Sequence, residues 1–310
     1  MTEDEHQVDG SLAPMPTDGV LEISSGEAFT IADVDAFLCE RPATVVALVG
    51  DADSGKSTLV CSIYDRALHG PFADRLSSGI RTIIALERRA HHERLDSGMQ
   101  IPDTMRTPIS EGLQFFHFAF SSMDDPSVRE DILISDRAGE LYNRARGNPE
   151  IVAELNEFPK ADVVSILLDG GRMAVPEERS GAMQAVRQSL RLLSDTGAVD
   201  KSSAVQVVTT KQDLLQAAGD WNTFQTRLDE FRGQLVKDFG GRVASLEFFT
   251  VSARDPKRVL DRAFGVDALM LSWLGVKRQR SFGRQLMAGS GATEFDKLSE
   301  RTFSEVRTNA

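Results

Sequence analysis

The sequence predicts an α/β fold with a mostly parallel sheet that is covered by helices on both faces. Continuous apolar runs, typical of strands buried on both faces, recur at 44–49, 115–120, 132–135, 163–168, 205–208 and 246–251. Apolar residues with helical spacing occur at 31–38, 58–68, 182–193, 224–239 and 266–274. Because strands and helices alternate, parallel strands joined by crossover helices are the expected arrangement.

The composition is that of a globular protein, with 41% hydrophobic and 26% charged residues among 310. No stretch reaches the roughly 18 apolar residues that a membrane span needs. The first ten residues are polar and acidic, which does not fit a secretory signal. Two cysteines, Cys39 and Cys61, are too few for a disulfide or zinc framework, so we expect a cytoplasmic protein.

The charge is concentrated at one end of the chain. Of the net charge of −12, residues 1–40 carry −10, because they contain ten acids and no Lys or Arg. We therefore expect an acidic flexible tail (1–28), one domain (29–276) and a polar C-terminal tail (277–310). A nearly neutral body does not favour nucleic-acid binding, and the four basic residues within 277–284 are too few for a stable membrane anchor.

The segment that follows the first buried run fits the Walker A pattern G-x-x-x-x-G-K-S/T, which forms a phosphate-binding P-loop. The glycines let backbone N–H groups surround a phosphate at the start of a helix. Lys56 would bind the outer phosphates as a catalytic group, and the Ser57 hydroxyl would bind Mg²⁺. The expected nucleotide contacts here are Gly50, Asp51, Asp53, Ser54, Gly55, Lys56, Ser57 and Thr58.

A second motif follows the run at 132–135 and reads Asp136-Arg137-Ala138-Gly139. An Asp at the end of a buried strand suits Mg²⁺, usually through water, and the Gly139 N–H would meet the γ-phosphate. The string is short and common in loop turns, so its position downstream of the P-loop carries the interpretation.

Two further motifs point to guanine. Thr210-Lys211-Gln212-Asp213 fits N/T-K-x-D at a strand end, and Asp213 can accept hydrogen bonds from the N1–H and the amine of guanine. Adenine lacks both donors, and leaving a buried carboxylate unpaired is costly. Lys211 would cover the base, and Ser252-Ala253 at the next strand end can offer a backbone N–H to the guanine oxygen.

The set GDADSGKS, DRAG, TKQD and SAR resembles the Ras-like GTPases of the TRAFAC class of P-loop NTPases, over roughly residues 43–275. The strings VALVGDADSGKSTL, IYDRALHGPFA, ALERRAHHERLDSG and RTPISEG resemble the bacterial double-GTPase family, which is linked to multi-component GTPase systems. The resemblance implies a six-stranded sheet with one antiparallel strand, at 113–120, and a nucleotide at the carboxyl edge of the strands.

The chain departs from the Ras-like pattern in the spacing of its motifs and at Glu140. An insertion at about 71–105 separates the first two motifs. The Mg²⁺-binding threonine of the pattern is assigned to Thr107, with Thr82 and Thr104 as alternatives. Glu140 stands where a water-orienting Gln is usual; it could orient water or be a surface acid. Arg106 and Arg137 could neutralise transition-state charge or be solvated loop arginines.

The expected function is that of a switch that binds GTP or GDP with Mg²⁺ and hydrolyses the β–γ anhydride of GTP, slowly unless a protein partner assists. The alternative is a nucleotide-binding adaptor or scaffold with little turnover, which the Glu140 departure keeps open. An ATPase or kinase is disfavoured by Lys211 and Asp213.

Overall fold

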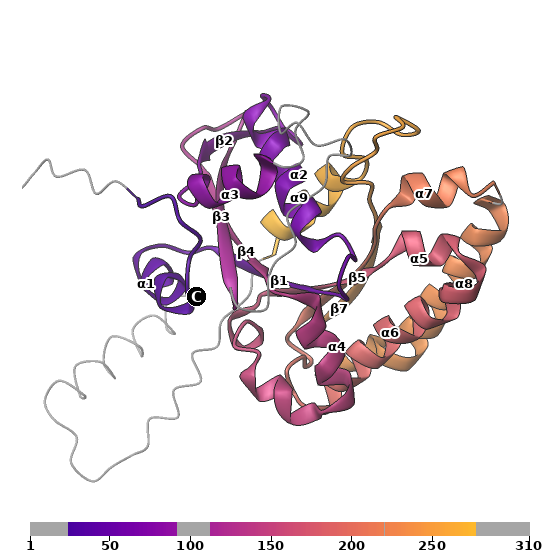
Figure 1. The fold of residues 1–310 in the computed structure, drawn as a ribbon. Helices are drawn as coiled ribbons and strands as arrows, with labels where there is room; N and C mark the ends of the chain where they lie inside the picture. Colours follow the sequence, from indigo (N-terminus) through magenta and orange to yellow (C-terminus); the bar gives the residue numbers. More distant parts are fainter. Residues whose placement is uncertain (1–23, 92–111, 220, 277–310) are drawn as a thin grey trace, which may run out of the picture. The chain divides into compact units, whose positions relative to one another are not determined.

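A computed structural model describes residues 24–91, 112–219 and 221–276. These residues form one seven-stranded sheet with the strand order β2-β3-β4-β1-β5-β6-β7 (Figure 1). The strands are β1 (Thr44–Val49), β2 (Arg75–Gly79), β3 (Gln114–Ser122), β4 (Arg129–Asp136), β5 (Val163–Leu168), β6 (Ala204–Thr209) and β7 (Ser245–Thr250). The helices are α1 (Ile31–Glu40), α2 (Lys56–Leu68), α3 (Ile83–Ala90), α4 (Gly139–Gly147), α5 (Gly170–Ala174), α6 (Pro176–Asp195), α7 (Gln212–Ala217), α8 (Trp221–Phe239) and α9 (Val266–Leu274).

The predicted α/β class and mostly parallel sheet are confirmed. Strands β4, β1, β5, β6 and β7 pair in parallel, and β3 is antiparallel to both of its neighbours. The expected count of six strands becomes seven because β2 adds an edge strand within the predicted insertion. Its sequence RLSSG holds one large apolar residue, Leu76, and so lacks the apolar run that marks the buried strands.

Two apolar layers hold the sheet. Helices α2, α3 and α9 pack on one face, and α4, α6 and α8 pack on the other (Figure 1). Each of these helices packs a stripe of apolar residues on the sheet, and the central strands β1, β3, β4, β5 and β6 are almost fully buried, which explains their continuous apolar runs. Helix α1 packs on the sheet through Val34 and Phe37. These two residues share an apolar cluster with Val45 of β1, Phe115 of β3 and Leu133 of β4.

The segment 24–28, which the sequence analysis placed in the acidic flexible tail, contacts α3. The backbone N–H of Ala85 donates to the carbonyl of Gly26, and Arg88 pairs with Glu27 at 3.0 Å. Among the helices of the described ranges, none combines the length and the apolar character that a membrane span needs.

Candidate nucleotide-binding site

The P-loop (50–57) joins β1 to α2, as the sequence predicted. Asp53 and Gly55 have positive φ angles of 61° and 97°, which turn the chain into the first turn of the helix. Gly55 is the residue just before the helix and suits this left-handed conformation because it lacks a Cβ. The first N–H groups of a helix have no partner within it, so this end of α2 is suited to an anion.

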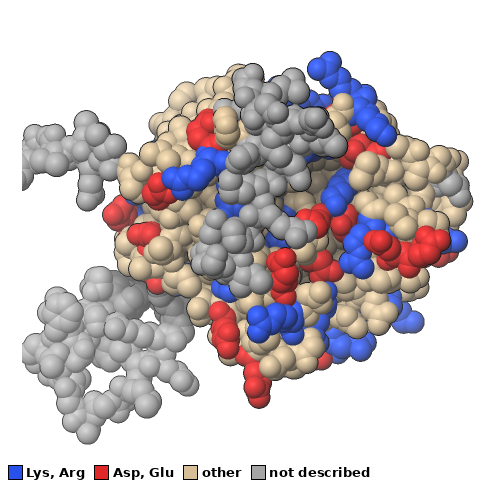
Figure 2. All heavy atoms as spheres, in the orientation of Figure 1, with Lys and Arg blue, Asp and Glu red and all other residues tan. Residues whose placement is uncertain are grey.

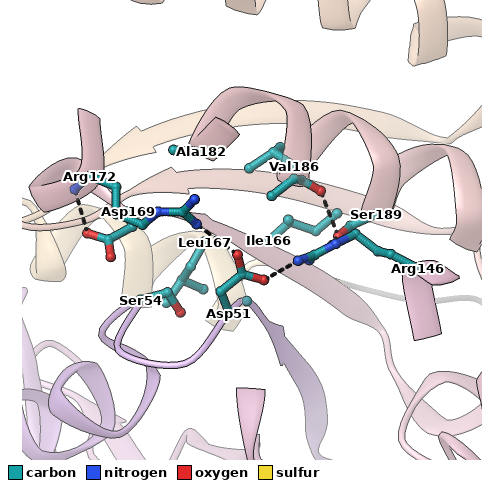
Figure 3. Close-up of a pocket in the computed structure, with 12 residues that line it drawn as sticks. Asp51, Ser54, Arg146, Ile166, Leu167, Asp169, Arg172, Ala182, Val186 and Ser189 are labelled. Atoms are coloured by element: carbon teal, nitrogen blue, oxygen red, sulfur yellow. Dashed lines mark hydrogen bonds and ion pairs between the residues drawn. The ribbon is translucent and has the colours of Figure 1, made fainter. Parts of the chain in front are cut away.

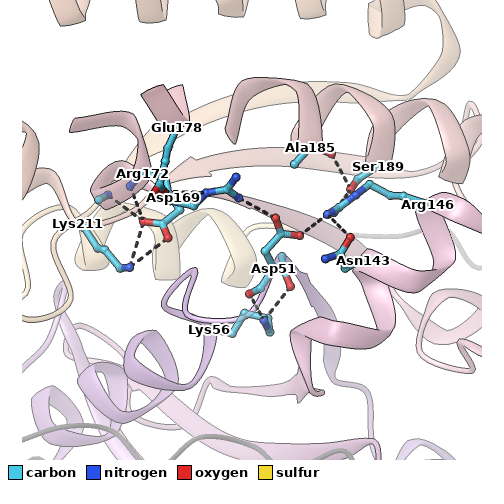
Figure 4. Close-up of polar contacts among 12 residues, drawn as sticks. Asp51, Lys56, Asn143, Arg146, Asp169, Arg172, Glu178, Ala185, Ser189 and Lys211 are labelled. Carbon is cyan, nitrogen blue, oxygen red and sulfur yellow. Dashed lines mark hydrogen bonds and ion pairs between the residues drawn. The ribbon is translucent and has the colours of Figure 1, made fainter. Parts of the chain in front are cut away.

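Lys56 lies inside the P-loop, and its side chain is almost fully buried. Its Nζ donates to the carbonyl oxygens of Gly50 and Asp51, each at 2.8 Å (Figure 4). Burial lowers the pKa of Lys56, while the carboxylates of Asp136 and Asp51 raise it and so oppose the shift. The two carbonyl contacts hold the Lys56 amine at the centre of the loop, where it can bind phosphate oxygens.

Ser57 and Asp136 meet where β1 and β4 end. These strands are parallel neighbours, so the residues that follow them reach the same edge of the sheet. The Ser57 hydroxyl donates to Asp136 Oδ2 at 2.9 Å, and Asp136 is fully buried. A hydroxyl and a carboxylate are hard oxygen ligands of the kind that Mg²⁺ prefers, so this pair could hold that ion.

The DRAG segment packs directly on the P-loop. A Cβ on Gly139 would lie 2.3 Å from the Ala52 nitrogen, so only glycine fits at the start of α4. Glu140 follows in the first turn and is partly exposed. Arg137 is buried and donates to Glu157 Oε2 at 3.0 Å.

Of Arg106 and the three threonines considered as Mg²⁺ ligands, the structure describes only Thr82. Arg106, Thr107 and Thr104 lie outside the described residues. Thr82 is buried just before α3, and its Oγ1 accepts a hydrogen bond from the His117 N–H at 3.0 Å.

The two motifs that the sequence predicts to bind guanine meet at the ends of β6 and β7, which are also parallel neighbours. The Ser252 hydroxyl donates to Asp213 Oδ1 at 2.7 Å, and both residues are buried. Ala253 follows Ser252. Thr210 Oγ1 donates to the carbonyl of Ser54 at 2.8 Å, which ties this group to the P-loop.

Lys211 contacts a carboxylate that the sequence analysis did not single out. Its Nζ lies 3.1 Å from Asp169 Oδ1, and Asp169 follows β5 and caps α5. The position of Asp169 directly after a buried strand is a signal that the sequence did offer.

Two arginines that no motif predicted hold the second residue of the P-loop. The Asp51 carboxylate accepts hydrogen bonds from Arg146 of α4 at 2.6 Å and Arg172 of α5 at 3.0 Å (Figure 3). These contacts and Asp169 line a small pocket beside the loop. Because Arg146 and Arg172 are 95 and 121 residues from Asp51, no local pattern indicates the pairing.

Basic and acidic side chains are interspersed on the face shown in Figure 2.

The carboxyl edge of the sheet carries the P-loop, the Ser57–Asp136 pair and the buried carboxylate of Asp213. Together these features define a P-loop protein of the α/β class. The sequence model of the Double-GTPase 2 family matches residues 44–274, and the chain belongs to this family. The predicted family relationship is confirmed.

Comparison with other proteins gave structural matches of low sequence identity. No curated protein matched the chain. The signal recognition particle receptor SRb-GTP/SRX complex from Chaetomium thermophilum contains a chain with 14% identity and a TM-score of 0.42, covering 76% of this chain and 97% of that one. The S. cerevisiae Ski7 GTPase-like domain, bound to GDP and inorganic phosphate, has 15% identity and a TM-score of 0.41, covering 77% of this chain and 51% of that one.

Proposed function

We propose that this protein is a GTP-binding switch that hydrolyses GTP to GDP and phosphate with Mg²⁺. One observation carries the proposal: Lys56, the Ser57–Asp136 pair and the Asp213–Ser252 pair lie at the carboxyl ends of parallel strands of one sheet. Ligands of α/β sheets bind at this edge. Membership of a GTPase family supports the same reading.

Phosphate and metal binding follow from the P-loop side of the site. Lys56 would exchange its carbonyl contacts for phosphate oxygens, and Ser57 and Asp136 would hold Mg²⁺ between them. The ion would neutralise charge on the outer phosphates. Asp213, oriented by the Ser252 hydroxyl, would accept hydrogen bonds from guanine.

The ion pair between Arg137 and Glu157 supports slow GTP hydrolysis in the absence of a partner. To reach a phosphate, Arg137 would first have to leave its buried ion pair with Glu157. We infer that a protein partner in a multi-component GTPase system assists hydrolysis. The partner either contributes a positive side chain of its own or frees Arg137 from its ion pair with Glu157. Glu140, partly exposed beside the P-loop, could orient the attacking water. The Arg137–Glu157 ion pair and Glu140 also support the alternative, which is an adaptor with little turnover.

Nucleotide binding tests the proposal first. We expect Mg·GTP and Mg·GDP to bind in a fluorescence or calorimetric titration, and an equal concentration of ATP not to displace them. Lys56→Ala should weaken binding by at least tenfold, because it removes a buried charged contact of more than about 1.4 kcal/mol. Lys201→Ala, at an exposed turn position, is the matched control and should bind as the unmodified chain does. Equal competition by ATP would disprove guanine selectivity.

Turnover separates the switch from the adaptor. In a single-turnover assay the purified chain should hydrolyse GTP at roughly 10⁻⁴ to 10⁻² per second, the range of GTPases without an assisting partner. Lys56→Ala sets the background. A rate equal to that background would favour the adaptor, and a rate above about 1 per second would contradict the need for a partner.

A further inference from the structure

Arg89, in the predicted insertion, reaches the residues proposed to hold Mg²⁺. It lies near the end of α3 and its side chain is 6% exposed. Its Nη1 lies 2.8 Å from Asp136 Oδ2, the same oxygen that accepts the Ser57 hydroxyl at 2.9 Å. A guanidinium therefore contacts the carboxylate at the point where the P-loop serine also meets it.

The position of Arg89 is built into the fold on several sides. Its Nη2 donates to Gln114 Oε1 at 2.6 Å, and its guanidinium lies 5.1 Å from the centre of the Phe116 ring. Both partners belong to β3, which neighbours β4. Charge-assisted contacts of this kind are about twice as strong as neutral hydrogen bonds, so the guanidinium is well anchored.

We propose that Arg89 is a tethered cation that competes with Mg²⁺ for Asp136. Two positive groups at one carboxylate oxygen repel each other strongly in a buried site, because little water screens them. Mg²⁺ binding at Ser57 and Asp136 then requires Arg89 to withdraw. Since Arg89 is part of α3, metal binding would break a contact between the end of that helix and Asp136 at the end of β4.

Competition and a purely structural ion pair predict different changes in Mg²⁺ binding when the charge of Arg89 is removed. If Arg89 only stabilised the fold, removing its charge would leave Mg²⁺ binding unchanged or weaker. If Arg89 competes, removing its charge strengthens Mg²⁺ binding. The inference rests on the proposed function, because it needs Mg²⁺ to bind with a guanine nucleotide.

The test measures release of a fluorescent GDP analogue as free Mg²⁺ is raised. The readout is the Mg²⁺ concentration at which slowing of release is half-maximal. Arg89→Gln should lower this concentration about tenfold, the size expected for one charged hydrogen bond. Arg88→Gln is the matched control: it removes the same charge from the same helix, at a side chain that is 60% exposed and paired with Glu27.

The outcomes separate the two proposals. An unchanged or higher Mg²⁺ requirement in Arg89→Gln overturns the competition, while nucleotide binding itself stands. If the unmodified chain retains no guanine nucleotide at any Mg²⁺ concentration, the proposed function fails, and the competition fails with it. Should Arg89→Gln not fold, Arg89→Lys decides, because the shorter, single-point charge should contact Asp136 less well and lower the requirement by a smaller factor.

Discussion

Gly139 shows how closely two distant motifs approach in this molecule. The start of α4 rests on the backbone of the P-loop, and a Cβ at position 139 would meet both the Ala52 nitrogen and the Asp51 carbonyl carbon at 2.3 Å. Neither atom belongs to a side chain that could rotate away. The glycine of DRAG is thus required by packing, in addition to any contact of its N–H with a phosphate.

Substitution of this glycine should be costly where a second glycine of the same helix tolerates it. Gly139→Ala should lower the free energy of unfolding by about 1–3 kcal/mol, as overpacking does, and weaken nucleotide binding because the P-loop must shift. Gly147→Ala, at the other end of α4, meets nothing within 4 Å and should change stability by less than about 1 kcal/mol. Denaturant unfolding of both variants measures the difference, and equal losses would refute the packing argument.

At the scale of elements, His117 joins the insertion to the sheet. The Arg81 N–H donates to His117 Nδ1 at 3.0 Å, so that nitrogen carries no proton. His117 Nε2 then carries the proton and donates to Asp131 Oδ1 at 2.8 Å. The residues that lead into α3 are therefore attached to β3 and β4 through one neutral imidazole.

Acid should weaken this junction. Burial lowers the pKa of His117, and Arg129 and Arg81 act in the same direction, while Asp131 opposes them. The unfolded chain takes up a proton at about pH 6.5 and the folded His117 does not, so stability falls as pH drops below about 6.5. Burial alone would raise the pKa of Asp131, but hydrogen bonds from His117 and Arg129 lower it to about 2. A second loss, of about 2 kcal/mol, is thus expected between about pH 4 and pH 2.

Unfolding free energies measured between pH 7 and pH 5 check the first window. His117→Gln should be less stable at pH 7 by about 1 kcal/mol, from the lost hydrogen bond to Arg81, but should lose much of the pH dependence. His69→Gln, at an exposed histidine, should keep it. The assignment fails if His117→Gln retains the slope of the unmodified chain.

For the molecule as a whole, sequence reasoning succeeded where local patterns reflect the sheet. Strands β1 and β5 are buried on both faces, which produces the apolar runs TVVALV and VVSILL. The site motifs could be placed together because parallel strands bring their carboxyl ends to one edge.

The same reasoning missed what depends on tertiary contact alone. Strand β2 is a polar edge strand that exists by pairing with β3. The arginines that contact Asp51 and Asp136 belong to α3, α4 and α5. The sequence of a helix does not indicate which distant residue a charged side chain will contact.

Because the candidate site draws on early, middle and late parts of the chain, a ligand bound there should stabilise the whole described body. At 100 times its measured dissociation constant, Mg·GDP should raise the free energy of unfolding by about 2.7 kcal/mol. The chain has two tryptophans, Trp221 in α8 and the buried Trp273 in α9, both far along the sequence from the P-loop. Their fluorescence and the far-ultraviolet circular dichroism should report one transition in urea, and GDP should move both signals equally. Lys56→Ala should show no shift at the same concentration. If GDP moved the circular dichroism transition but left the tryptophan transition in place, the P-loop and the strands that carry the predicted guanine-binding motifs would not form one cooperative site.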